Sequence, residues 1–241
     1  MQITIDNKLK LLAGLPIEVE DLGLVHPLKL KEIIEYGYSE YLSNLNVFAV
    51  KKEQMFKDVP EGLNEFDVLL TLGDLNINLM LKEALSFFLK DEIFLYKEKQ
   101  LIIVGTNDDN FRIINRKNFM DLRKVIQVQN YLISADDIEA NPKNEKAKEV
   151  KERLKKSKEE VNRIKKKEDE LDETDFFDML SAISSKSNCI SKIDVMELTI
   201  FQIYEEFKRL NHIDQYETGI LALLQGAKNV KLKHWSSKIS L

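Results

Sequence analysis

The chain has 241 residues, of which 44% are hydrophobic, so it is long enough to bury a core in one large domain or two smaller ones. Its net charge of −5 argues against a general affinity for nucleic acids or acidic membranes. The single cysteine, Cys189, excludes an intrachain disulfide, and no stretch approaches the roughly 18 apolar residues of a membrane span. The first residues lack the apolar core of a signal peptide, so we expect a cytoplasmic protein.

Residues 1–133 are predicted to form a mixed α+β domain in which helices pack around a small antiparallel sheet. Alternating β-branched residues predict a first strand at MQITI, and IEVED is compatible with a second. Pro27 favours a helix that starts there, because proline lacks only an N–H that the first helical position does not use. Gly37 predicts a break between two short helices.

The second half of this segment changes from helical to strand periodicity and back. Phe66–Leu72 is predicted to be a helix, and Asn76 or Asn78 is suited to cap a further one. Helical spacing returns over Asn118–Tyr131. Between these helices, three runs predict the strands of the sheet: EIFLY, QLIIVG and FRIIN.

Residues 134–174 are predicted to be a linker followed by a long charged helix. Its apolar residues follow alternating spacings of three and four, with Ser157 and Glu168 at the two places where the series lacks an apolar residue. This spacing places them on one narrow line: Ala147, Val150, Leu154, Val161, Ile164 and Leu171. So thin a stripe suits a partner helix better than a globular core. A solvated single helix or a tether is the other reading, and both stay open.

Residues 175–241 are predicted to be a C-terminal helical domain, which makes the whole chain predominantly helical α+β. Three pairs of acidic residues resemble helix caps: Asp175 with Asp178, Asp194 with Glu197, and Asp214 with Glu217. The last two pairs predict a helical hairpin with its turn near His212, ended by Gly226. The alternating run VKLKHWSSKI predicts a strand or an extended tail folded back onto the hairpin.

Motifs for catalysis, metal binding or cofactor binding do not emerge from the sequence. It contains no phosphate-binding glycine loop, and His26, His212 and His234 lie far apart. Cys189 has no signature around it, and the acidic run 168–178 lacks the order of a calcium loop. We therefore expect a protein that is not an enzyme and has no cofactor.

Seven residues are predicted to contact a partner protein. Four belong to the charged helix and three to the aromatic-rich C-terminal domain: Val150, Leu154, Val161, Ile164, Tyr204, Phe207 and Trp235. A place in the core explains the last three equally well.

Two stretches resemble proteins from the tail-morphogenesis region of phages and prophages of low-GC Gram-positive bacteria. They are VHPLKLKEIIEYGYSEYL and the stretch from DVMELTIFQIYEEF to the end of KLKHWSSKI. Within that setting the chain looks like a tail assembly chaperone, which implies a non-enzymatic, helix-rich, cytoplasmic protein. Such proteins shield the tape measure protein until the tail tube forms around it.

Other functions stay open at this point. One is a minor structural or scaffold component of the phage particle, and self-association through the charged helix is compatible with either role. A small DNA-binding regulator is a third, since the predicted hairpin is similar to a helix-turn-helix. However, Tyr216–Leu224 is mostly apolar and lacks the side chains that read base edges, so nucleic-acid binding is not expected.

Replacing Leu154 and Val161 with Asp tests the charged helix. Two carboxylates on the apolar line cannot pack against a partner helix without a large desolvation cost, so partner binding should be abolished. Circular dichroism should show that the flanking segments remain folded. Binding that survives the double substitution would contradict the hypothesis.

Overall fold

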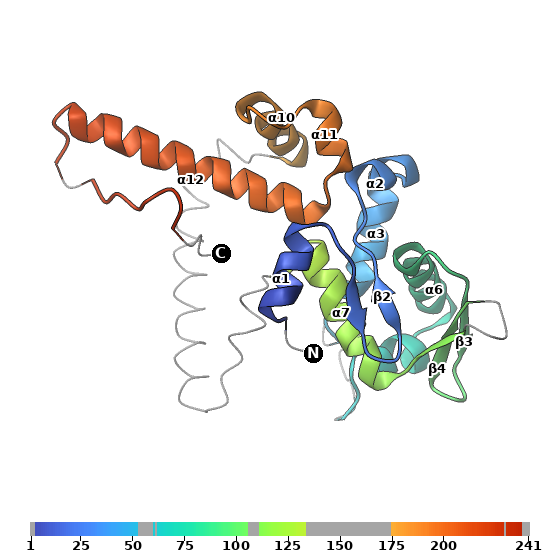
Figure 1. Cartoon of the computed structure of the whole chain (residues 1–241). Helices are drawn as coiled ribbons and strands as arrows, with labels where there is room; N and C mark the ends of the chain where they lie inside the picture. The colour runs from blue at the N-terminus through green and yellow to red at the C-terminus, as the bar shows by residue number, and fades with distance from the viewer. Residues whose placement is uncertain are drawn as a thin grey trace.

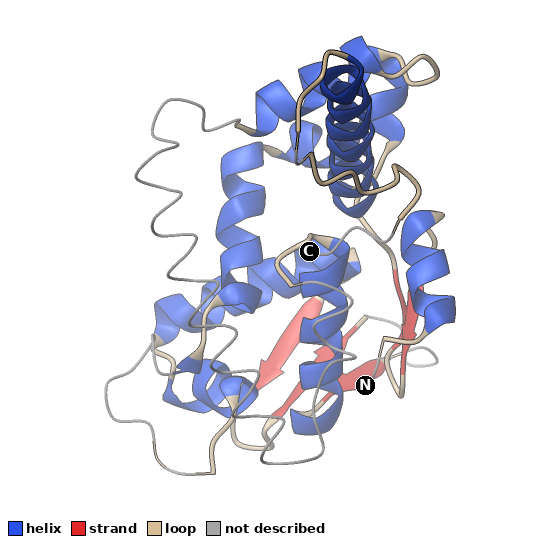
Figure 2. Ribbon diagram, turned by 90° about the vertical axis from the view of Figure 1, so that its left-hand side faces the viewer, coloured by secondary structure: helices blue, strands red, loops and turns tan. Residues whose placement is uncertain are grey.

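A computed structural model of the chain describes residues 3–52, 60, 62–105, 111–133, 175–228 and 230–237. This described part is a predominantly helical α+β fold with two small antiparallel sheets, which confirms the predicted fold class (Figures 1 and 2). Its elements in chain order are α1 (Ile5–Leu12), β1 (Ile17–Val19), β2 (Gly23–Val25), α2 (Leu30–Tyr36), α3 (Tyr38–Ala49), α5 (Glu65–Asp67), the π-helix η1 (Val68–Leu72), α6 (Leu75–Leu89), β3 (Ile93–Tyr96), β4 (Leu101–Val104), β5 (Arg112–Ile114), α7 (Arg116–Gln129), α10 (Phe176–Lys186), α11 (Lys192–Glu197) and α12 (Ile200–Leu224).

The strand predicted at MQITI is not present in its described residues: Ile3 and Thr4 belong to no strand, and helix α1 begins at Ile5. Thr4 caps the helix, because its side-chain oxygen accepts a hydrogen bond from the backbone N–H of Asn7 at 3.3 Å. Leu11 is the residue of α1 that reaches the core. Threonine is common both in strands and at helix caps, and five alternating residues are too few to distinguish the two.

The predicted strand at IEVED is confirmed as β1, but its partner β2 was not predicted. Ile17 pairs with Val25 in an antiparallel hairpin, and the turn passes through left-handed backbone at Asp21 (φ 62°) and Gly23 (φ 87°). Strand β2 has only three residues, too short a run to show an alternating pattern.

The three-stranded sheet β3-β4-β5 confirms the predicted strands in all three runs. One face of the sheet is buried by β-branched side chains at alternating positions: Ile93, Ile102, Val104 and Ile114. Helix α6 packs against β3, so this sheet and α6 form one side of the core.

Helix α2 begins three residues later than Pro27 predicts. Lys29 instead pairs as an isolated β-bridge with Thr199, and the Leu30 N–H donates to the Leu198 carbonyl at 2.9 Å. The residues after Pro27 are therefore extended because they bond to the C-terminal segment, a contact that local sequence does not reveal.

Other helix boundaries agree more closely with the predictions. Gly37 separates α2 from α3 with φ at 116°, a value that favours glycine, so the predicted break is confirmed. The helix predicted over Phe66–Leu72 is present as α5 and η1. The helix predicted over Asn118–Tyr131 is present as α7, capped by Asn115.

Helix α6 is capped by Asp74, whose side chain accepts from the Ile77 N–H at 2.9 Å. The predicted caps Asn76 and Asn78 were wrong. Asn78 lies buried inside the helix, where its side-chain amide donates to the Leu69 carbonyl at 2.9 Å.

The C-terminal segment contains one confirmed cap and one corrected one. Asp175 caps α10 as predicted, accepting from the Asp178 N–H at 2.8 Å. Asp194 and Glu197 do not cap the next long helix, because both lie within α11 and Thr199 caps α12.

The predicted helical hairpin with a turn near His212 is wrong, since α12 runs without interruption for 25 residues. Asp214 does not cap a second helix; it forms an ion pair with Lys186 of α10. The backbone turns only after Gln225, at Gly226 (φ 89°), so the predicted end of the helical region is confirmed.

The C-terminal helices share one hydrophobic core with the N-terminal segment. Ile183 of α10, Val195 of α11 and Ile203 of α12 are all buried in it. Helix α11 packs against α2, and α12 packs against α1 and α7. The charged run at 134–174 lies outside the described residues, so the proposed domain boundaries stay predictions.

The continuity of α12 can be tested by replacing Asn211 with Pro. Proline removes a helical N–H and clashes with the carbonyl four residues earlier, at a cost of about 3 kcal/mol in a helix interior. Circular dichroism and urea unfolding should show lost helicity and lower stability. Asn211→Ala is the control, and a proline variant as helical as this control would restore the hairpin interpretation.

Candidate protein-binding surface

The root of α12 is held against the body of the protein by a cluster of aromatic side chains, which we call the aromatic joint: Tyr38, Tyr41, Tyr131, Phe176 and Tyr204. The Tyr204 ring stacks on that of Tyr131, with centroids 4.8 Å apart and planes 10° apart. Phe176 stacks on Tyr38 at 5.4 Å and contacts Tyr204 at 6.2 Å. The joint therefore connects α3, α10, α12 and the turn that follows α7.

Polar contacts complete the aromatic joint on the side of α12. The Tyr131 hydroxyl donates to Glu205 at 2.7 Å, and Lys208 donates to the same hydroxyl at 2.9 Å. The Lys208 ammonium also lies 4.5 Å from the centre of the Tyr131 ring, a cation–π contact. Burial lowers the pKa of Lys208 and raises that of Tyr204.

A second set of contacts ties α11 to α2. Lys29 and Glu197 form an ion pair at 2.7 Å. The hydrogen bond and charge of each partner raise the pKa of Lys29 and lower that of Glu197. Both side chains are exposed, so this pair contributes little to stability.

Two of the predicted partner-binding residues belong to this root. Tyr204 lies in the aromatic joint, and Phe207 packs partly buried against the core. Their place matches the core explanation that the sequence left open. Contact with a partner protein stays a prediction for both.

Beyond the root, α12 extends away from the body (Figure 1). We call residues 215–224 together with the described tail 230–237 the distal arm. The tail folds back along α12 without forming a strand, which confirms the second of the two predicted conformations. Arg209 donates to the Trp235 carbonyl at 2.6 Å, and the His212 ring lies 3.0 Å from the His234 carbonyl oxygen.

Gly219 allows the tail to approach α12 closely. A Cβ atom at this position would lie 3.3 Å from the Leu232 side chain, which is tighter than an ordinary contact. It would lie 3.5 Å from the Val230 side chain, which is an ordinary contact. The His234 ring meets Tyr216 edge-on at 5.3 Å. Backbone and ring contacts thus fix the course of the tail.

The distal arm exposes several large apolar side chains: Leu221 (58%), Leu223 (42%), Leu224 (79%), Leu232 (37%) and Trp235 (46%). Leu221 and Leu224 lie three residues apart, on one face of the helix. Apolar side chains gathered on a projecting element are typical of protein-binding sites. The arm is the candidate site.

Of the predicted contact residues, Trp235 is the one that the structure places in the arm. Val150, Leu154, Val161 and Ile164 lie outside the described residues. Leu221 was not among the predicted contact residues, because this stretch was predicted to be the second helix of a hairpin. The continuous helical spacing of apolar residues on both sides of Asp214 was the signal that could have found it.

Chemical sites are not apparent in the described residues. They hold no group of three or more His, Cys, Asp or Glu placed to bind a metal ion. A pocket of about 450 Å³ between α2 and α6 contains Glu32 and Lys90, which are already paired at 2.5 Å. Among the described helices, none combines the length and apolarity needed to cross a membrane.

Residues 165–240 match the model of the family described as YomV second domain. This match takes in α10, α11, α12 and the described tail. Over 235 residues the chain is 23% identical to the SPbeta prophage-derived uncharacterized protein YomV of Bacillus subtilis (strain 168), an alignment that covers 95% of this chain and 86% of that relative. No solved structure matches the chain.

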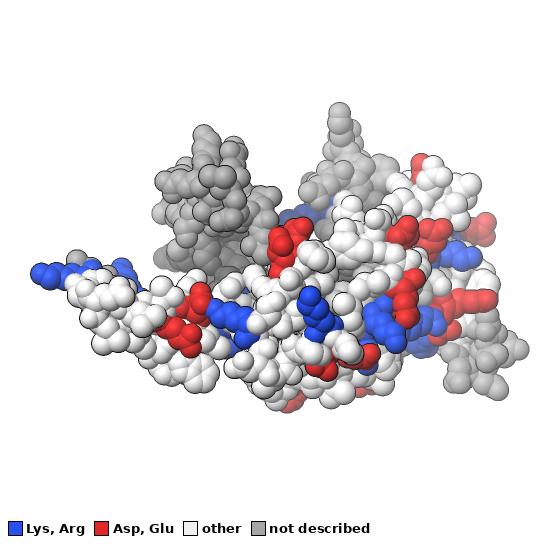
Figure 3. Space-filling view, turned by 90° about the horizontal axis from the view of Figure 1, so that it is seen from above, with Lys and Arg blue, Asp and Glu red and all other residues white. Residues whose placement is uncertain are grey.

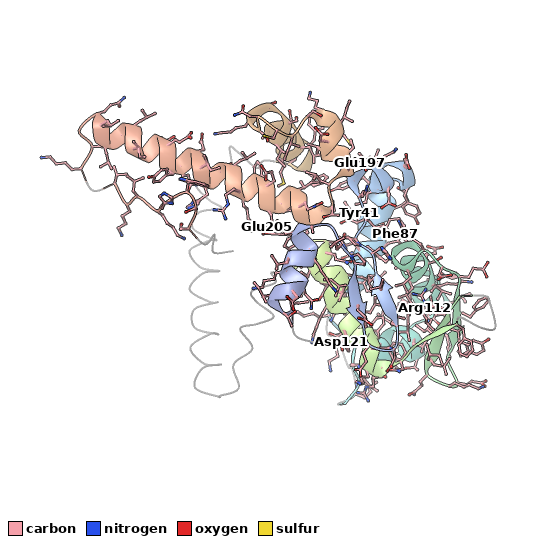
Figure 4. All side chains as sticks on the ribbon, viewed as in Figure 1. Tyr41, Phe87, Arg112, Asp121, Glu197 and Glu205 are labelled. Carbon is pink, nitrogen blue, oxygen red and sulfur yellow. The ribbon has the colours of Figure 1, made fainter. Side chains whose placement is uncertain are left out.

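Replacing Tyr41 with Phe tests the aromatic joint. The Tyr41 hydroxyl donates to the Asn130 side chain at 3.0 Å in a buried position, so its loss leaves an acceptor unpaired (Figure 4). We expect the free energy of unfolding at neutral pH to fall by about 1–3 kcal/mol. Tyr96→Phe, at an exposed position, is the control and should be neutral.

The same variant predicts a pH dependence. Burial, with smaller effects from Tyr38 and Tyr204, raises the pKa of Tyr41 in the folded protein. Its stabilising contribution is therefore complete below the unfolded pKa of about 10 and is lost as pH rises above it. Urea midpoints should fall less steeply above pH 10 in Tyr41→Phe than in the natural protein, and equal slopes would contradict this account.

Proposed function

We propose that this chain is a non-enzymatic prophage protein that binds another protein through the distal arm of α12. The observation that supports the proposal is the exposed apolar cluster of the arm, which projects from a body that is otherwise folded around its own core. The similarity to a prophage-derived protein supports the setting.

Within that setting, we propose that the chain is a tail assembly chaperone that shields the tape measure protein in the host cytoplasm. This proposal rests on the resemblance of the two sequence stretches to tail-morphogenesis proteins. The geometry suits the task. A long coiled partner such as the tape measure protein offers apolar stripes, and the arm offers a short apolar helical face that such a stripe can cover.

The proposal predicts that replacing Leu221 and Leu224 with Glu abolishes recovery of the partner. The tagged chain and this variant would each be expressed in the native host, the prophage induced, and co-purifying proteins identified by mass spectrometry. Burying two carboxylates in an apolar contact costs several kcal/mol, so partner recovery should fall at least about tenfold.

Leu75→Glu with Leu79→Glu is the matched control, since these leucines are 73% and 48% exposed on α6, away from the arm. A long tail protein recovered with the natural chain and the control, but absent with the arm variant, would support the chaperone. Recovery of the chain inside finished particles would instead favour a minor structural or scaffold component. Equal recovery with both variants would contradict binding through the arm.

A further inference from the structure

Charge is distributed unevenly along this acidic protein. From Thr218 to the last residue of the sequence there is no Asp or Glu, and there are four lysines. Because the whole chain carries −5, the preceding residues carry −9. Residues 218–241, which include most of the arm, are thus a positive stretch of a negative chain.

The lysines of the arm are available to a partner. Lys228, Lys231 and Lys233 are exposed, and no carboxylate of the described residues lies within ion-pair distance of them. Figure 3 shows blue side chains at the end of the arm, with red ones closer to the body. Some lysines elsewhere in the described part are paired with carboxylates, as Lys117 is with Glu20 at 2.9 Å.

The tail presents lysines and apolar residues side by side. Leu232 lies between Lys231 and Lys233 and reaches over Gly219, while the backbone is held at Trp235 by Arg209. Anchoring through the backbone leaves the charged side chains free for external contacts. The exposed apolar side chains of the tail, Leu232 and Trp235, therefore have basic neighbours in Lys231 and Lys233.

We propose that the distal arm binds an acidic amphipathic segment of a protein partner, with Leu232 and Trp235 covering its apolar residues and Lys231 and Lys233 pairing with its carboxylates. This inference rests on the proposed function and specifies the chemistry of the partner. Charge complementarity carries it: the arm combines exposed apolar side chains with lysines that no carboxylate of the described residues pairs, and an amphipathic segment with Asp or Glu beside its apolar residues matches both.

A polyanion is a poorer match for the arm than such a segment. Nucleic acid would use the lysines but leave the exposed leucines without apolar contacts. An anionic bilayer could accept both, but it would also repel a body that carries −9, whereas a short peptide contacts the arm alone.

The test uses the full-length chain and two synthetic peptides that share the same leucines at helical spacing. One peptide has Glu at its polar positions and the other has Lys. Fluorescence anisotropy should show binding of the Glu peptide at least about tenfold tighter than that of the Lys peptide, and a loss of this preference as salt rises from about 50 to 500 mM. Vesicles with and without phosphatidylglycerol are a third probe.

Lys231→Glu with Lys233→Glu should reverse the preference, so that the Lys peptide binds tighter than the Glu peptide. Lys97→Glu with Lys99→Glu is the matched control, because these exposed lysines are also two residues apart, in the turn between β3 and β4. The control variant should bind both peptides as the natural chain does, within about twofold.

Equal binding of the two peptides by the natural chain, or an unchanged preference in Lys231→Glu with Lys233→Glu, would overturn the inference. So would binding to phosphatidylglycerol vesicles without binding to the Glu peptide. If Leu221→Glu with Leu224→Glu still abolishes partner recovery in the host in those cases, protein binding through the arm stands and only the acidic partner is wrong. If it does not, the proposed function fails as well.

Discussion

The position of the arm depends on the burial of the first turn of α12. Ile200, Phe201 and Ile203 lie in the same core as α7 and the small sheets. An α-helix is stiff, and 25 residues extend about 37 Å at 1.5 Å per residue, so the orientation of the first turn determines where the last turn lies. Thr199 adds to this anchoring, because it caps α12 and pairs with Lys29 of the N-terminal segment. The packing of the first turn of α12 thus determines the position of the arm, which needs few contacts of its own.

The two ends of α12 are stabilised by different interactions. At the root, stacked rings and partly buried polar groups around Tyr131 fix the helix to the body. At the arm, a tail held by Arg209 and His212 covers one side and leaves leucines exposed. Exposed leucines ordinarily promote self-association, but the exposed lysines of the tail give two arms charge of the same sign, which opposes their association. This charge favours a different partner of opposite sign over a second arm.

Much of the fold could be predicted wherever a segment carries its own signal. The strands β3 to β5, the break at Gly37 and the cap at Asp175 follow from local residues and agree with the structure. The errors arise where one residue type serves two purposes. Asp214 and Glu217 have the spacing of a helix cap, yet inside α12 the Asp214 carboxylate pairs with Lys186 of a different helix. Local sequence cannot distinguish these uses, because the deciding partner lies 28 residues away along the chain.

The candidate site was harder to predict than the fold, for a related reason. Phe207 and Leu221 both continue the helical spacing of apolar residues along α12, so the sequence treats them alike. One packs against the core and the other is 58% exposed, a difference set by where α10 and the body stop covering the helix. Trp235 was proposed from composition, and its exposure depends on a tail whose backbone is held by Arg209. The positive charge of the last residues, by contrast, can be counted from the sequence alone. Only the structure shows that this charge lies beside a helix that projects from the body.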